Sequence, residues 1–360
     1  MRTHLGILLT TLATAAVTVA AVPAQADRDR GPDRDLRWQR GVVDTDQSFR
    51  GLDAVDRRTA WVSGGSISGG DGSVWRTTDA GRTWEEVSPP GTTGLSLRDV
   101  EAKDADTAVV MSIGNGEDSR IWRTDDGGAT WTETFRNTEE AAFYNCLDFY
   151  PGGRRGLAVS DPVDGKFRVI ATEDGGRSWE VLPDAGMPDS TGEFNFSASG
   201  DCLVIAGRTA WFGSGGSAAR VFRSADRGLT WTATDSTLRA DETAGVFGLA
   251  FRTPRQGVAV GGDFDPAVVE PDGSALTRDG RTWQVGGDLA HLGEDAAWVS
   301  RRLLLVTGES GPEAGTSLST DGGRTWERLS TTGYHTLDCT RDGSCWAAGG
   351  GGRVARASAR

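Results

Sequence analysis

One octapeptide pattern recurs along the chain and limits the possible folds more than any other feature. The pattern is Ser/Thr-x-Asp-x-Gly-x-Thr/Ser-Trp, and its clearest copy runs from Ser319 to Trp326. Successive terminal tryptophans lie 43 to 52 residues apart, a period that is typical of four-stranded blades stacked around one axis. The paired aspartates and tryptophans are Asp79 and Trp84, Asp126 and Trp131, Asp174 and Trp179, Asp226 and Trp231, Asp279 and Trp283, and Asp321 and Trp326.

The composition of the octapeptide suits a tight turn between two strands. The aspartate can accept hydrogen bonds from backbone N–H groups of its own turn. The glycine permits a backbone conformation that a Cβ atom opposes, and the tryptophan buries a large apolar area. Because a single blade cannot bury both of its faces, the units must stack. We therefore interpret the six copies as scaffolding and not as a functional signature.

A count of the units predicts an all-β, seven-bladed β-propeller, with six or eight blades as the alternatives. The last unit has strands at Thr336–Cys339, Cys345–Gly349 and Arg353–Arg356, and it ends without an octapeptide. Trp38-Gln39-Arg40 resembles the strand that follows each octapeptide. An N-terminal strand can therefore complete the last blade and close the ring, which avoids open sheet edges.

The N-terminus has the pattern of a secretory signal peptide. Arg2 precedes an apolar run from Leu5 to Val22, and Ala24-Gln25-Ala26 matches a cleavage site. We predict a signal peptide over residues 1–26, cleaved after Ala26, a flexible charged leader over 27–37 and one propeller domain over 38–360. An uncleaved anchor is the alternative. No other stretch is long enough to span a bilayer, so we expect a secreted chain without a membrane span.

Export makes disulfide bonds possible, and the four cysteines allow three connectivities. Cys339 and Cys345 flank a hairpin turn and can pair across its strands. Cys146 would then pair with Cys202, between neighbouring blades. No CxxC motif occurs, so we predict neither a metal site nor a cofactor.

The formal net charge of −13 argues against nucleic acid and anionic membranes as partners. We expect a monomer whose ligand is a protein or a glycan.

Two sequence features resemble known families. The octapeptides resemble the Asp box, or bacterial neuraminidase repeat. Phe251–Gly261 and Phe149–Val159 are similar to the inner hairpins of the photosystem II stability/assembly factor family of seven-bladed, WD40/YVTN-like propellers, and this resemblance covers about 320 residues. It implies an exported accessory protein that binds other proteins. Bacterial relatives often carry an oxidoreductase label, but the sequence has no GxGxxG after a strand and no haem motif.

Binding residues are expected on the face opposite the octapeptide turns. There the loops after each second strand and the entries to each first strand surround the channel mouth. The candidates in these loops are Asn145, Asp161, Asp164, Lys166, Glu193, Asp263, Tyr334 and His335.

The same loops leave an enzymatic alternative open. Asp161 and Glu193 are weak candidates for the two carboxylates of an extracellular glycoside hydrolase. Sialidase activity is disfavoured, because the chain after Ala26 has three tyrosines and no Arg-Ile-Pro element before the first blade. We assign no catalytic residue. The favoured hypothesis is a secreted, non-catalytic propeller that binds a protein or glycan through its loop face.

Overall fold

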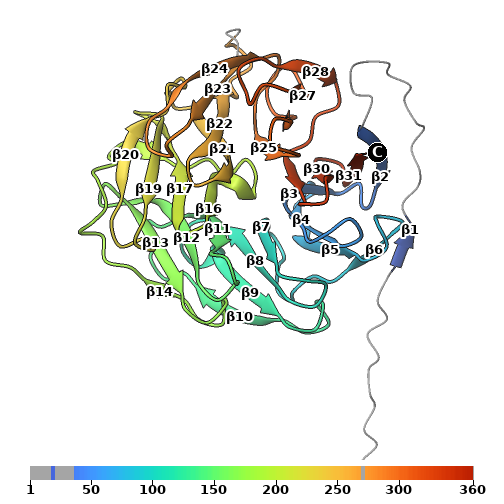
Figure 1. Ribbon diagram of the computed structural model, residues 1–360. Coiled ribbons are helices and arrows are strands. Elements are labelled where there is room, and N and C mark those ends of the chain that lie inside the picture. The colour runs from blue at the N-terminus through green and yellow to red at the C-terminus, as the bar shows by residue number, and fades with distance from the viewer. Residues whose placement is uncertain (1–17, 21–35, 269–271, 360) are drawn as a thin grey trace, which may run out of the picture.

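The computed structural model describes residues 18–20, 36–268 and 272–359, and it forms a ring of seven antiparallel sheets (Figure 1). Each sheet is one blade, and the innermost strands of successive blades contact one another around the central channel. The predicted all-β, seven-bladed propeller is confirmed. Within the described ranges, the helical elements are two single 3₁₀ turns, η1 (Gly116–Asp118) and η2 (Gly200–Cys202).

The first four blades follow the chain from the inner strand to the outer strand. Blade 1 contains β3 (Gln47–Ala54), β4 (Ala60–Ser66), β5 (Ser73–Thr77) and β6 (Thr83–Glu86). Blade 2 contains β7 (Ser96–Ala102), β8 (Ala108–Ile113), β9 (Arg120–Thr124) and β10 (Thr132–Arg136). Blade 3 contains β11 (Tyr144–Phe149), β12 (Gly156–Val163), β13 (Lys166–Thr172) and β14 (Glu180–Val181). Blade 4 contains β16 (Leu203–Ala206), β17 (Thr209–Gly213), β19 (Arg220–Ser224) and β20 (Thr232–Asp235).

The last three blades depart from this order in two ways: blade 5 has two additional strands at its inner edge, and the outer strand of blade 7 comes from the N-terminal part of the chain. Blade 5 contains β21 (Ala244–Thr253), β22 (Gln256–Asp263), β23 (Asp272–Thr277) and β24 (Gln284–Leu289), and the short strands β18 (Gly215–Gly216) and β15 (Glu193–Phe194) extend it at its inner edge. Blade 6 contains β25 (Asp295–Trp298), β26 (Leu304–Gly308), β27 (Gly315–Ser319) and β28 (Glu327–Ser330). Blade 7 contains β29 (Thr336–Cys339), β30 (Ser344–Ala348), β31 (Arg353–Ala359) and β2 (Leu36–Val42).

The ring closes through β2, which pairs with β31 along its whole length (Figure 1). Closure by an N-terminal strand is therefore confirmed. Leu36 lies opposite Ala359 and is buried, so β2 begins within the predicted leader, two residues before Trp38. Within the predicted signal peptide, β1 (Thr18–Ala20) pairs with the outer edge of β6. The other residues of that segment, and residues 27–35 of the predicted leader, lie outside the described residues.

The polar groups of each octapeptide turn form hydrogen bonds with one another. In blade 2, the backbone N–H and the hydroxyl of Thr130 donate to the two oxygens of Asp126 over 2.8 and 2.6 Å. Gly127 also donates to the carbonyl of Asp106, at the hairpin between the first two strands (2.7 Å). The octapeptide turns and these hairpins therefore share one face, and the loop face lies opposite.

Tryptophans fill the spaces between neighbouring blades. Trp84 is 1% exposed and packs edge-on against Trp346 of blade 7, with ring centroids 6.0 Å apart. Trp61 of blade 1 makes the same kind of contact with Trp131 of blade 2 at 6.5 Å. Each blade thus depends on its neighbour for the burial of its apolar face.

Carboxylates in the channel tie one inner strand to the next. A carboxylate on each of five inner strands accepts a hydrogen bond from a backbone N–H of the following inner strand. The pairs are Asp53 with Ala102, Asp99 with Leu147, Asp148 with Ile205, Asp295 with Leu337, and Asp338 with Ala54. Burial raises the pKa of all five acids, and it raises the pKa of Asp148 and of Asp295 to about 7. The folded protein therefore holds protons in its channel that the unfolded chain releases.

Replacing Trp84 with alanine should lower the free energy of unfolding by about 3–5 kcal/mol, because the change leaves a cavity between blades 1 and 7. Urea denaturation of the variant and the parent measures this loss. Val285→Ala is the control, because Val285 is 75% exposed and its truncation should have almost no effect. Equal stability of Trp84→Ala and the parent would contradict the packing role.

The channel acids predict that the protein is less stable at pH 8 than at pH 5. An acid with a raised folded-state pKa stabilises the fold at low pH, and this contribution is lost as pH rises through the folded-state pKa, about 7 for Asp148. Asp148→Asn should remove part of the loss, on the order of 3 kcal/mol at about 1.4 kcal/mol per pKa unit.

Urea denaturation across this pH range provides the measurement. Asp126→Asn serves as the control, because hydrogen bonds within its turn lower the pKa of Asp126, which therefore titrates below this range. A parent protein with equal stability at both pH values would contradict the assignment.

Candidate functional site

A pocket of about 340 Å³ lies on the loop face at the mouth of the central channel. Three aromatic side chains line it, and Phe196 packs edge-on against both Phe247 (4.5 Å between centroids) and Phe264 (5.9 Å). Phe264 is 41% exposed, although large apolar side chains are usually covered. The basic wall of the same pocket is formed by Arg50 from β3 and Arg98 from β7.

The two arginines differ in how their charges are balanced. Arg50 forms an ion pair with buried Glu294 (3.0 Å). Arg98 has no carboxylate partner among the described residues, and it donates instead to the hydroxyl of Ser96 and the carbonyl of Ser197. Burial and the neighbouring charge of Arg50 lower the pKa of Arg98 to about 9, so its guanidinium remains charged at neutral pH. Glu294 favours the charged form of Arg98 without pairing with it, so within the described part of the chain the mouth presents a cation that forms no ion pair.

A buried polar network fixes the other side of the mouth. His335 lies between two glutamates, with Nδ1 2.9 Å from Glu294 Oε1 and Nε2 2.7 Å from Glu309 Oε1. Arg353 pairs with Glu309. Burial opposes the charged form of Glu294, but His335 and Arg50 outweigh it and lower the pKa of that carboxyl. The network joins blades 6, 7 and 1, and it orients Arg50.

The segment 196–201, here called the plug, crosses the mouth. Arg50 donates to the carbonyl of Ala198 (2.9 Å), and Arg98 donates to the carbonyl of Ser197 (2.5 Å). Ser197 and Ala198 also line the pocket. A segment that precedes blade 4 is therefore held by side chains of blades 1 and 2.

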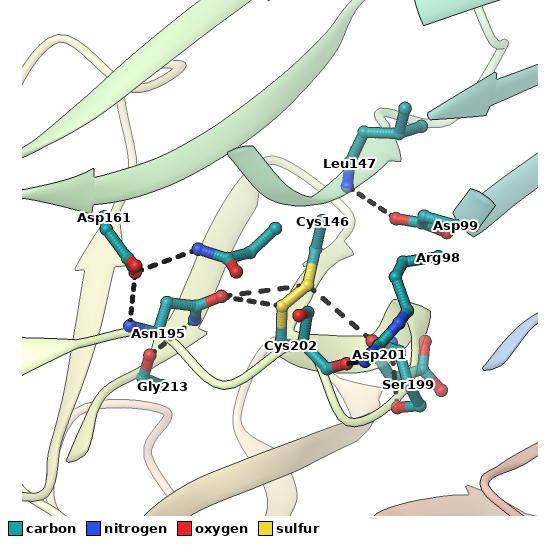
Figure 2. Close-up of a disulfide and its surroundings, with 12 residues drawn as sticks. Arg98, Asp99, Cys146, Leu147, Asp161, Asn195, Ser199, Asp201, Cys202 and Gly213 are labelled. Atoms are coloured by element: carbon teal, nitrogen blue, oxygen red, sulfur yellow. Dashed lines mark hydrogen bonds between the residues drawn. A yellow bond between two sulfur atoms is a disulfide. The ribbon is translucent and has the colours of Figure 1, made fainter. Parts of the chain in front are cut away.

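Both ends of the plug are anchored (Figure 2). Before it, Asn195 donates its backbone N–H to Asp161 Oδ1 (2.8 Å) and its side-chain amide to the carbonyl of Gly213 (2.7 Å). After it, Cys202 forms a disulfide with Cys146 of β11. This bond and the Cys339–Cys345 bond confirm the predicted pairing.

Asn145 and Asp161 support the plug and do not line the pocket. Asp161 Oδ1 accepts from the side-chain amide of Asn145 (2.9 Å) as well as from Asn195. Burial raises the pKa of Asp161 to about 6, although these two hydrogen bonds oppose the shift. The structure thus gives Asp161 a positioning role for the mouth.

Glu193, the other candidate catalytic carboxylate, is engaged in the protein interior. It is buried in β15, forms an ion pair with Arg220 and accepts a hydrogen bond from the hydroxyl of Ser214 (2.6 Å). Neither Glu193 nor Asp161 lines the mouth pocket. The geometry therefore lends no support to a glycosidase pair at this position.

The remaining candidates are spread over three blades. Asp164 lies in the turn between β12 and β13, and Lys166 donates to the carbonyl of Asp184 (3.2 Å), at a separate groove. Asp263 of β22 pairs with Arg239 (3.4 Å). Tyr334 is buried and stacks on Trp38, with centroids 6.3 Å apart. Among all the sequence candidates, His335 is the one that enters the ion-pair network of the mouth.

Sequence reasoning missed Arg50, Arg98, Glu294 and the three phenylalanines. The two arginines share a position, because each is the unpaired residue at the bulge of its inner strand, in Phe49-Arg50-Gly51 and Leu97-Arg98-Asp99. A β-bulge depends on the pairing of two strands, so the sequence alone did not distinguish these arginines from the others.

The described residues contain no group of three or more His, Cys, Asp or Glu side chains that could hold a metal ion. In the same part of the chain, no helix is long and apolar enough to cross a bilayer.

Comparisons with known proteins identify the fold. No family model matches the chain, and no curated protein matches it in sequence. Among solved structures, it is similar to YCF48 bound to D1 peptide, with 15% identity, a TM-score of 0.62 and coverage of 89% of this chain and 96% of that one. YCF48 from Cyanidioschyzon merolae matches with 16% identity and a TM-score of 0.60 over 89% of this chain and 98% of that one.

The WD40 propeller domain of Doa1 is a further structural neighbour, with 12% identity and a TM-score of 0.58 over 88% of this chain and 95% of that one. At these identities the likeness concerns the fold alone. The chain thus shares the propeller architecture of the photosystem II assembly factor YCF48, as its inner hairpins predicted.

Proposed function

We propose that this protein is a non-catalytic propeller that binds a segment of a partner protein at the channel mouth. The observation that carries the proposal is Arg98, a half-buried cation that forms no ion pair with a carboxylate of the described residues, beside an aromatic pocket. A ligand that places a carboxylate on Arg98 and an apolar side chain against Phe196 and Phe264 satisfies both features. Charge-assisted hydrogen bonds of this kind are the strong ones in protein recognition.

The surroundings of the pocket favour a peptide over a glycan. Edge-on phenylalanines form an apolar cleft, whereas the polar side chains nearby, Glu294 and His335, are already paired with each other. A partially exposed aromatic such as Phe264 is typical of protein-binding surfaces. YCF48, whose fold is similar, is known in a structure bound to D1 peptide, which supports a peptide as the ligand.

Export of the chain is part of the proposal. It rests on the apolar run and the Ala24-Gln25-Ala26 motif of the N-terminus, and two disulfide bonds are compatible with it. We further propose that the exported protein acts as a monomer, with the loop face free for its partner.

Selection from a random peptide library, followed by calorimetry of synthetic peptides at about pH 6, tests the proposal. We expect peptides that combine a carboxylate with an aromatic or aliphatic neighbour. Arg98→Met should weaken their binding by about tenfold to a hundredfold, the equivalent of one charge-assisted hydrogen bond. Arg208→Met is the matched control, since Arg208 is exposed in the hairpin between β16 and β17, on the opposite face.

Selected peptides that bind Arg98→Met as tightly as the parent would exclude the mouth as their site. Failure to select any peptide, together with binding on a glycan array, would overturn the proposal.

A further inference from the structure

A second hollow, of about 270 Å³, lies on the loop face beside the aromatic pocket, and Arg50 and Arg98 line both hollows. Its other lining residues are small and polar, apart from one leucine. They are Ser48, Gly65, Ser66, Gly69, Gly70, Gly94, Leu95 and Ser96. This hollow, here called the cradle, is open to a small polar ligand and has two guanidinium groups in its wall.

The cradle has no carboxylate among its described lining residues, although the chain contains 51 acidic residues. Three other hollows of the protein each include at least one aspartate or glutamate in their lining. Two acids bind lining residues of the cradle, and both are already engaged. Asp46 accepts hydrogen bonds from the hydroxyls of Ser66 and Ser68 (2.6 and 2.8 Å). Glu294 pairs with Arg50 and lines the aromatic pocket. The charge distribution of the cradle therefore favours an anion.

Two neighbouring blades contribute the same pair of side chains to the cradle. Ser48 and Arg50 stand two residues apart in β3 of blade 1, and Ser96 and Arg98 stand two residues apart in β7 of blade 2. Each arginine is the unpaired residue at the bulge of its strand. A ligand in the cradle therefore meets a hydroxyl and a guanidinium from each of the two blades.

Several donors of the cradle are not used within the described part of the protein. Arg98 donates from Nε to the hydroxyl oxygen of Ser96 (3.1 Å) and from Nη1 to the carbonyl of Ser197, and no described residue accepts from Nη2. Because the Ser96 oxygen accepts from Arg98, its own proton is free to be donated to a ligand. The hydroxyl of Ser48 has no hydrogen-bond partner among the described residues. These groups can bind an anion through charge-assisted hydrogen bonds.

Glycines keep the cradle accessible. Gly69 and Gly94 have φ values of 86° and 75°, in the left-handed region, and a Cβ atom on either would meet no other atom within 4 Å. A Cβ atom on Gly65 would lie only 2.9 Å from the hydroxyl oxygen of Ser96. A side chain at position 65 would therefore compete with a ligand for this hydroxyl.

We propose that the cradle binds a tetrahedral oxyanion, that is, a phosphate or sulfate group. Donors that come from two blades suit a group with oxygens on several sides better than a flat carboxylate, which has two. The site lies next to the proposed peptide pocket and shares Arg98 with it. An oxyanion in the cradle should therefore weaken the binding of an acidic peptide. This consequence rests on the proposed function, whereas the oxyanion site itself does not.

Titration of the full chain with inorganic phosphate tests the site without any peptide. The amide signals of isotope-labelled glycines are followed by nuclear magnetic resonance at neutral pH and constant ionic strength, in a buffer free of phosphate and sulfate. We expect saturable shifts of Gly65, Gly69, Gly70 and Gly94 with phosphate and with sulfate. Acetate should bind at least about tenfold more weakly, because it satisfies fewer donors.

A titration with phosphoserine separates the two sources of the group. Tighter binding of phosphoserine than of inorganic phosphate assigns the site to a phosphoryl group carried by a larger ligand. Weaker binding of phosphoserine assigns the site to the free anion.

Three variants and one control locate the anion. Ser48→Ala and Ser96→Ala should each weaken phosphate binding by about tenfold, because each removes one hydrogen bond to a charged group. Arg98→Met should abolish the glycine response. If Arg98→Met does not fold, the two serine variants, which lose a single oxygen each, still test the site. Arg208→Met is the matched control and should bind phosphate like the parent, because Arg208 is exposed on the opposite face.

Shifts that do not saturate, or that spread over glycines of every blade, would mean an adventitious ion only and would overturn the site. Parental phosphate binding by both serine variants would do the same, and equal binding of acetate would contradict the tetrahedral class. A selected acidic peptide should bind at least about tenfold more weakly in saturating phosphate, and unchanged binding would contradict the sharing of Arg98. Phosphate binding at the cradle without any peptide binding would refute the proposed function alone.

Discussion

The closure of the ring is the constraint on which the rest of the structure depends. A blade has two apolar faces and can cover them only with its neighbours, so an open arc would leave two faces and their sheet edges exposed. The pairing of β2 with β31 joins the two ends of the propeller in one sheet. The contact of Trp84 with Trp346 then buries the seam between blades 1 and 7. Every inter-blade feature, including the channel, follows from this closed geometry.

Closure also gathers buried carboxyl groups around the central channel. Inner strands that converge on one axis bring their channel-facing side chains together, and five of these strands contribute an acid that bonds to the next strand. These bonds hold the blades in register, but they concentrate carboxyl groups in a buried space. Burial in this space raises the pKa of these carboxyl groups, so the arrangement that aligns the strands also couples the stability of the fold to pH.

The repeats carried enough information to predict the architecture. The six octapeptides and the early Trp38 strand set the number of blades and the closure, because both depend on local turn chemistry and on strand order. The functional residues were harder to find. Asp161 and Glu193 were candidates because they lie in polar loops, yet their oxygens accept hydrogen bonds from Asn195 and Ser214. The sequence alone does not show which polar side chains are already engaged in hydrogen bonds within the protein.

The sequence by itself thus determined the blade count and the face that carries the octapeptide turns, because both follow from short-range patterns repeated at a regular spacing. Only the tertiary structure determines which residues form the channel mouth. Arg50, Arg98, Glu294 and His335 come from four different blades, and the plug that they surround precedes a fifth inner strand. Residues this far apart in the chain become neighbours only through the radius and closure of the ring, and no local pattern encodes that distance.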